Sequence, residues 1–280
     1  MAGGLSFDDL VAESYELAFE ETFSGPDVNL SRWHTSYLPQ WSSTERSAAR
    51  YRFVDGSLHL LIEADQQPWC PELDGPTRVS SLQTGVFAGP PGTAIGQHRF
   101  DSRAVVREEQ TNVRLFTPRF GAFSIRARAT DDPRCMVSLW MIGYEDGPER
   151  SAEICVFEIF GTDVGPSAAA IGMGLHPFGD PTIEDDFAQV RLPIDVREPH
   201  DYAVEWIPDG VTFFVDDAPV RTVRQSPGYP MQFMLGLYEF GDHDRDAADY
   251  PKRFVVESFR AYRRSEPDPV ADRDPEEDRP

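Results

Sequence analysis

The strongest constraint on the fold is a series of short segments with alternating apolar residues, separated by turn-forming residues. The segment "YAVEWIPDGVTFFVDDAPVRTV" (202–223) predicts three consecutive strands, with turns at Pro208-Asp209-Gly210 and Asp216-Asp217. Residues 123–129, "FSIRARA", alternate apolar and polar side chains, as a half-buried strand does. The stretches "GSLHLLIEA", "MVSLWMIG" and "RFVVESFRAYR" predict further strands. Many short strands joined by turns indicate an all-β sandwich or barrel.

The two ends of the chain differ from this pattern. The segment "SFDDLVAESYEL" has modest helical character, and we expect residues 1–17 to form an N-terminal extension. The last residues, "SEPDPVADRDPEEDRP", combine prolines with acidic side chains and almost no apolar groups. Because such a composition cannot offset the entropy cost of ordering, residues 265–280 are predicted to be a disordered acidic tail.

The charge of the chain restricts its partners. A formal net charge of −22 argues against a nucleic-acid partner, which would require clustered Lys and Arg, whereas a neutral polysaccharide remains suitable. The same acidity can serve solubility alone. No apolar run reaches the ~18 residues of a membrane helix, so no membrane association is expected. The N-terminus lacks the basic start of a secretory signal, which predicts a cytoplasmic protein, or a secreted one if the true start lies upstream.

Three cysteines, Cys70, Cys135 and Cys155, are too few and too scattered to form a disulfide framework. No CxxC spacing indicates a zinc site. The sequence therefore predicts neither a metal nor a cofactor, and we expect a monomer.

The segment "SAEICVFEIFG" (151–161) places two glutamates in an apolar run, although carboxylates are seldom buried unless paired. On a helix, Glu153 and Glu158 would lie ~140° apart. In a regular strand they would face opposite sides, but a one-residue bulge would bring them to the same face. Retaining glycosidases need two carboxyl groups ~5–5.5 Å apart. Alternatively, one glutamate faces solvent and the other pairs with an arginine.

Several ordered motifs resemble glycoside hydrolase family 16, the laminarinase-like enzymes. Their bulged Glu-x-Asp-x-x-Glu strand follows an apolar strand with a tryptophan, as "SLWMIG" precedes "AEICVFEIFG" here. The resemblance extends over residues 18–264 and includes the stretches "FEETFSGPDVNLSRW", "RFGAFSIRARA", "PHDYAVEWIPDG" and "RFVVESFRAYRR". It implies a single domain, a concanavalin-like β-jelly-roll sandwich of two antiparallel sheets.

By this resemblance Glu153 takes the nucleophile position and Glu158 the general acid/base position. The implied activity is that of a retaining endo-glycoside hydrolase on a β-linked polysaccharide, with a β-1,3-glucan as the first expectation and a galactan as the second. A lectin-like binding protein on the same fold is the alternative, and an intracellular scaffold is a third.

Cys155 stands where the family has an aspartate between the two glutamates. A thiol, with an ordinary pKa of ~8.5, is a weak hydrogen-bond donor and carries no charge beside two carboxylates. We expect Glu158 to be a less effective acid in consequence, or the pH optimum to be lower. Two alternatives are that catalysis has been lost and that Cys155 merely fills space in the strand.

Four further residues are candidates for substrate binding. Trp140 resembles a sugar-stacking tryptophan but also suits the core, and His176 suits either the cleft or the surface. Trp69 lies in a loop, where it can bind ligand or fix the loop, and Tyr238 is expected to narrow the cleft. Val86 stands where the family's loop has an arginine, which leaves glucan recognition open.

Overall fold

The computed structural model describes residues 5–243 and 246–265. The predicted disordered tail lies outside them, apart from Ser265. The described strands form two large sheets, in which every pairing is antiparallel, and one short two-stranded ribbon. The predicted all-β jelly-roll sandwich is confirmed.

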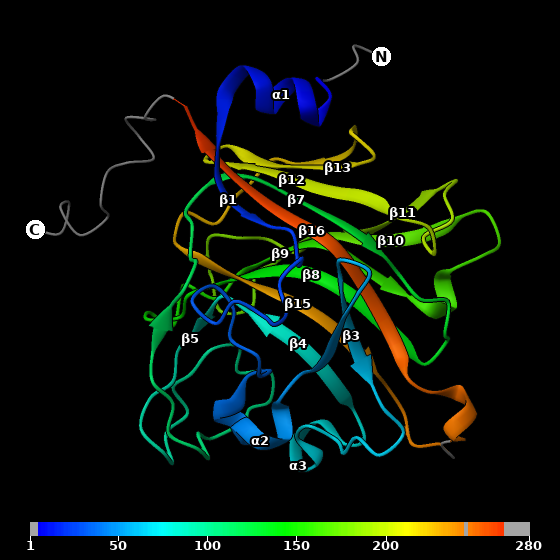
Figure 1. Ribbon diagram of the computed structural model, residues 1–280. Helices are drawn as coiled ribbons and strands as arrows, with labels where there is room; N and C mark the ends of the chain where they lie inside the picture. Colours follow the sequence, from blue (N-terminus) through cyan, green and yellow to red (C-terminus); the bar gives the residue numbers. More distant parts are fainter. Residues whose placement is uncertain (1–4, 244–245, 266–280) are drawn as a thin grey trace, which may run out of the picture.

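The larger sheet has eight strands in the order β14-β13-β12-β7-β16-β3-β2, with β1 also paired to β16 (Figure 1). Their bounds are β1 (Tyr15–Glu21), β2 (Arg50–Val54), β3 (Ser57–Ile62), β7 (Gly121–Arg128), β12 (His200–Ile207), β13 (Gly210–Val215), β14 (Ala218–Val223) and β16 (Lys252–Arg264). The three-strand meander predicted over 202–223 is present as β12, β13 and β14.

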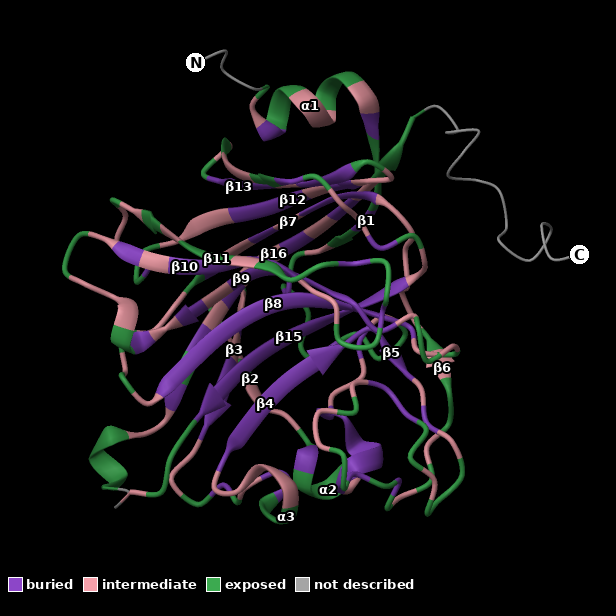
Figure 2. Ribbon diagram, turned by 180° about the vertical axis from the view of Figure 1, so that it is seen from behind, coloured by how far each residue is buried: buried purple, intermediate pink, exposed green. Residues whose placement is uncertain are grey.

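The smaller sheet has six strands in the order β11-β10-β9-β8-β15-β4. Their bounds are β4 (Arg78–Gln83), β8 (Cys135–Gly143), β9 (Glu153–Phe160), β10 (Ala169–His176), β11 (Asp186–Leu192) and β15 (Met231–Glu239). Every residue of β4, β8 and β15 is buried, and Figure 2 shows these three strands as continuously buried ribbons. Such strands must be covered on both faces.

Two apolar clusters provide that cover. The main core lies between the sheets and takes alternate residues of both, such as Phe123 of β7 and Leu139 of β8. A second cluster, with Trp41 and Trp140, lies on the other face of the six-stranded sheet. There the sheet meets loops and three short helical segments: η1 (Pro39–Trp41), α2 (Thr44–Ser47) and α3 (Pro71–Asp74). Figure 1 shows α2 and α3 below this sheet. The remaining elements are β5 (Gly85–Val86), β6 (Val113–Arg114), η2 (Gly161–Asp163) and η3 (Ala247–Asp249).

The segment predicted as an N-terminal extension contains α1 (Phe7–Ser14) and the start of β1. Ser6 caps α1 by accepting a hydrogen bond from the Asp9 backbone N–H. Phe7 packs edge-on against Phe214, so α1 covers part of the outer face of the eight-stranded sheet. The domain boundaries remain a prediction. None of the described helices has the length and apolar character required to cross a membrane.

Candidate functional site

Strand β9 contains the irregularity that brings its two glutamates together. Its pairing with β8 runs from Leu139–Phe157 directly to Trp140–Cys155, so Val156 is an extra residue. Val156 and Phe157 therefore both face the main core, in place of strict alternation. Glu153 and Glu158 lie on the opposite face, on either side of this bulge. The sequence expectation of a bulged strand is confirmed.

The next strand accommodates the bulge with a glycine. Gly174 of β10 pairs with Cys155 and has φ +143°, a conformation that other residues rarely adopt. A Cβ atom there would lie 2.1 Å from the backbone oxygen of Asp186. Only glycine fits beside the bulge without moving β11, so the local backbone depends on this residue.

The face of the sheet that carries the glutamates borders a cavity of about 330 Å³, here called the cleft. It is lined by Glu153 and Glu158 and by the four residues that the sequence assigned to substrate binding, Trp140, His176, Tyr238 and Trp69. Tyr37, His98, Phe100 and Phe178 also line it. Residues from β8, β9, β10 and β15 thus meet loop residues far away in sequence.

Cys155 lies between the two carboxylates. Its Sγ is 3.9 Å from Glu153 Oε2 and 3.8 Å from Glu158 Oε1, and the residue has no exposed surface. These two oxygens can be no farther apart than the sum of those distances. This bound admits the ~5–5.5 Å separation of a retaining pair.

The surroundings of Glu158 and Cys155 favour the protonated form of each. Burial, and next the charge of Glu153, raise the pKa of Glu158 to about 6. Burial and both glutamates raise the pKa of the Cys155 thiol well above its usual value, so it stays neutral. Glu158 therefore has an elevated pKa even though no third carboxylate stands between the pair. A carboxyl group that is protonated near pH 6 can act as a general acid.

His98, which the sequence analysis did not identify, is the nearest basic group to Glu153. Its Nδ1 lies 3.0 Å from Glu153 Oε1, although the two atoms lack good hydrogen-bond alignment. The charges of Glu153 and Glu145 outweigh burial and raise the pKa of His98. A protonated imidazole here offsets the charge of Glu153. His98 lies in a loop without periodic apolar residues. Only the fact that it is a histidine could have indicated a role in the site.

The two tryptophans contribute more to the shape of the cleft than to its exposed surface. Trp140 is 5% exposed and Trp69 is 1% exposed. The indole N–H of Trp140 donates to the hydroxyl of Tyr238 at 3.2 Å, and that of Trp69 donates to Asp74 at 2.6 Å. Tyr238 also packs edge-on against Tyr37. These contacts fix the aromatic rings, and sugar stacking by either tryptophan remains a prediction.

His176 and Phe178 border the other side of the cleft. His176 pairs with Glu153 in the β9–β10 register, and its Nδ1 lies 2.6 Å from Asp185 Oδ1. Phe178, two residues on, is 53% exposed and contacts the ring of His98. It is thus the most accessible aromatic ring at the site. The sequence analysis did not identify it, although it lies two residues after His176 in "LHPFG".

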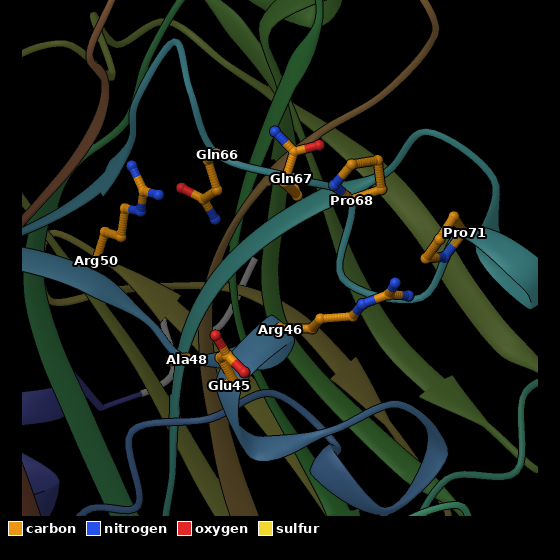
Figure 3. A pocket seen from close by; sticks show the side chains of 8 residues that line it. All are labelled: Glu45, Arg46, Ala48, Arg50, Gln66, Gln67, Pro68 and Pro71. Atoms are coloured by element: carbon orange, nitrogen blue, oxygen red, sulfur yellow. The ribbon is translucent and has the colours of Figure 1, made fainter.

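A separate hollow of about 490 Å³ lies near α2 and the segment 66–71 (Figure 3). Its arginines are already engaged: Arg46 pairs with Glu72, and Arg50 with Glu63 and Asp65. No aromatic residue lines it, and none of the candidate site residues reaches it. We therefore place the function in the cleft.

Among the residues that the structure describes, no group of three or more His, Cys, Asp or Glu side chains is arranged to hold a metal ion. The cleft presents carboxyl and imidazole groups, with the Cys155 thiol beside the two glutamates. The absence of a cofactor and the monomeric state remain predictions.

The chain is similar to a known protein family and to several solved structures. The profile of "Glycosyl hydrolases family 16" matches residues 110–252, slightly more than half of the chain. A search of curated proteins found no match. Among solved structures, a GlcNAcα1-4Gal-releasing endo-β-galactosidase from Clostridium perfringens is similar, with 26% identity and a TM-score of 0.77. The match covers 90% of this chain but only 63% of the galactosidase.

Two glucanases share the fold at lower identity. A laminarinase from Flavobacterium sp. UMI-01 is 17% identical with a TM-score of 0.59, over 89% of this chain and 100% of that one. A non-specific endo-β-1,3(4)-glucanase is 16% identical with a TM-score of 0.62, over 94% of this chain and 93% of that one.

Proposed function

Because the chain belongs to glycosyl hydrolases family 16 and is therefore a glycoside hydrolase, we propose that it is a retaining endo-enzyme acting on β-linked polysaccharides. We propose β-galactosides as its first substrate class and β-1,3-glucans as the second. The substrate is thus an oligosaccharide or polysaccharide.

One observation carries the proposal: the bulge at Val156 places Glu153 and Glu158 on the same face of β9, both within 4 Å of the Cys155 sulfur. A strand without this extra residue would direct one of them into the core. Two carboxyl groups in one cleft, one of them with a raised pKa, meet the requirement for acid/base and nucleophilic roles.

In the proposed reaction, the Glu153 carboxylate attacks the anomeric carbon while Glu158 donates its proton to the departing glycosidic oxygen. The carbon–oxygen bond breaks, and a covalent bond to Glu153 forms. Glu158, now ionised, takes a proton from water, whose oxygen displaces Glu153 from the same carbon. The neighbouring imidazole of His98, when protonated, stabilises Glu153 as an anion before attack and after release.

The order of substrates differs from the expectation based on sequence, which put a glucan first. The galactosidase from C. perfringens is more similar in both identity and TM-score than the two glucanases described above. At 16–17% identity the glucanases support the fold alone. Val86, in the position of the family's loop arginine, also favours a substrate other than a glucan.

The test is the release of reducing ends from a panel of β-galactans and β-glucans, with proton NMR of the first anomer formed. We expect cleavage of at least one polymer, initial products with retained configuration, and loss of cleavage in Glu153→Gln. The exposed-site variant Glu184→Gln is the matched control. If wild type and Glu153→Gln bind one polymer equally and neither cleaves any, the protein is a binding protein. A product with inverted configuration would exclude the two-step mechanism.

A further inference from the structure

A second cavity, of about 750 Å³, adjoins the cleft, and His98 and Phe178 line both. We refer to it as the side pocket. We infer that the side pocket binds a neutral pyranose attached to the sugar that Glu153 attacks, so that the enzyme prefers a branched or capped substrate over an unsubstituted one. This inference rests on the proposed function, because it names the substrate class of the same site.

The side pocket presents the kind of surface that sugar rings bind. Ile95 and Phe178 are 54% and 53% exposed, two of the largest exposed fractions among the apolar side chains of the described residues. With Phe87 they form apolar walls that suit the C–H faces of a pyranose. Binding sites combine such walls with a few polar groups, and a volume of 750 Å³ lies within the usual range for them.

Glu145 supplies a polar group for sugar hydroxyls. Its Oε1 accepts the His98 backbone N–H at 2.6 Å, and within residues 5–243 and 246–265 no partner is seen for its Oε2. Burial raises the pKa of Glu145 to about 7, so near neutral pH the carboxyl group can either donate or accept. A sugar hydroxyl can do both as well.

The charges around the side pocket favour a neutral occupant. Asp146 is paired with Arg114 and Arg150. The guanidinium of Arg99 is held by the backbone oxygens of Ser102 and Ala104. Two donor groups of Arg99 are thus occupied, and the carboxylates of Glu145 and nearby Glu153 repel an anion.

The wall of the side pocket formed by residues 94–98 is fixed before any ligand arrives. The carbonyl oxygen of Gln97 accepts hydrogen bonds from the side chains of Gln40 and Trp41, both at 2.8 Å. The Gln97 amide donates to the Gly143 oxygen at 2.5 Å. Gly96 packs so closely against Trp41 that a Cβ atom would lie 2.9 Å from the indole ring. A preformed wall avoids the entropy cost of ordering a loop on binding.

The position of the side pocket indicates which sugar it serves. His98 separates it from the cleft and lies 3.0 Å from Glu153, the proposed nucleophile, while Glu158 lines only the cleft. A group in the side pocket is therefore attached on the Glu153 side of the scissile bond. This is the side of the sugar that becomes covalently linked to the enzyme.

The experiment compares two pentasaccharides built on the backbone that is cleaved fastest in the polysaccharide panel. One is linear, and the other carries a single α-linked neutral hexose; a third carries a sulfate at the same place. The ratio of kcat/KM for branched over linear is measured in wild type, in Ile95→Asp, and in the control Leu30→Asp, which changes a 66% exposed leucine elsewhere. Both substituted sites are exposed, so the variants should fold.

We expect wild type and Leu30→Asp to prefer the branched pentasaccharide by about tenfold or more, equivalent to ~1.4 kcal/mol. Ile95→Asp should lose most of this preference. Equal rates for branched and linear substrates in wild type, an unchanged ratio in Ile95→Asp, or a preference for the sulfated chain would each overturn the inference while leaving the proposed function intact.

If no polymer is cleaved, the proposed function fails. The affinity of the protein for linear and branched pentasaccharides then tests the side pocket on its own. Titration calorimetry with linear and branched pentasaccharides on both galactan and glucan backbones measures it directly. Tighter binding of a branched chain that Ile95→Asp abolishes supports the side pocket. Equal affinity for branched and linear chains, or no binding of either, contradicts it.

Discussion

Charged residues on the outer faces of the two sheets differ in their solvent exposure and in their ion pairs. On the eight-stranded sheet, Arg126 pairs with Asp201 and Glu257, and Arg128 also pairs with Glu257, all of them accessible to solvent. On the six-stranded sheet, Glu153 is 5% exposed, and among the described residues only His98 is a basic neighbour within salt-bridge distance. Both faces arise from the same strand alternation, with the main core on the other side.

The two arrangements differ in their effect on stability and on pKa values. Exposed ion pairs gain little, because water and salt already screen the charges. Burial of carboxyl groups beside one another is unfavourable for their ionised forms, and it raises the pKa of Glu158 to about 6. The six-stranded sheet thus carries an energetic cost at the position where proton transfer is proposed. The variants below test this contrast, from the largest expected effect to the smallest.

The largest effect is expected from Glu158→Gln, which removes the proposed general acid. We expect kcat to fall by ~10²–10⁴-fold, the usual contribution of such a group. Glu257→Gln, the same change on the eight-stranded sheet, should leave kcat unaltered. Steady-state kinetics on the best polymer checks both variants. Equal losses in the two would mean that neither acts chemically.

The stability of Glu158→Gln should differ from wild type in a pH-dependent way. The pKa of Glu158 is about 6 in the folded protein, against the ordinary glutamate value of 4.5 that applies to the unfolded chain, so the folded state binds the proton more tightly. Stability therefore falls as pH rises through this window, by up to about 2 kcal/mol.

Glu158→Gln avoids this loss, and we expect it to be more stable than wild type at pH 8 by up to that amount, relative to its difference at pH 4. Urea unfolding at the two pH values measures this, and a pH-independent difference would show that burial of Glu158 is not the cause.

Cys155→Asp adds a third buried carboxylate between the two glutamates, which should make the six-stranded sheet differ even more from the exposed ion pairs of the eight-stranded sheet. Its charge would raise the pKa of Glu158 further, by about one unit. The alkaline limb of kcat/KM, expected near pH 6 in wild type, should move upward by the same amount. The neutral variant Cys155→Ser should leave the limb in place. A profile that is identical in all three proteins would remove Cys155 from the account of the site.

The smallest effect is expected from Arg128→Gln. This change breaks one ion pair of the eight-stranded sheet, with Glu257, and an exposed pair is worth about 0.2–1 kcal/mol. The free energy of unfolding should fall by no more than about 1 kcal/mol, and by less in 1 M salt. A loss of several kcal/mol would show that the two faces do not differ as described.

Local patterns were sufficient to predict the strands and the bulge that brings Glu153 and Glu158 to one face. Alternation located β7, because a half-buried strand must alternate to cover the core. A near-continuous apolar run located β8, and turn residues located the β12–β14 meander. The bulge could be inferred because Glu153 and Glu158 have the wrong spacing for one face of a regular strand. These features depend on neighbours along the chain, which a sequence displays directly.

The loops around the cleft could not be predicted in this way. His98 reaches Glu153 because the neighbouring Gln97 is hydrogen-bonded to residues 40, 41 and 143. Phe178 is exposed because β10 ends two residues earlier. Trp69 and Trp140 are candidates from sequence, but their low exposure depends on packing between distant segments. Contacts of this kind leave no periodic trace in the sequence.

The hydrogen bonds that hold residues 94–98 separate two traits that a lineage could alter independently. The proposed reacting groups lie on a strand of the sandwich, whereas the proposed choice of sugar depends on residues 94–98, which are held in place through Gln97. Mutations in residues 94–98 would change the preferred sugar and leave the proposed reacting groups unaltered.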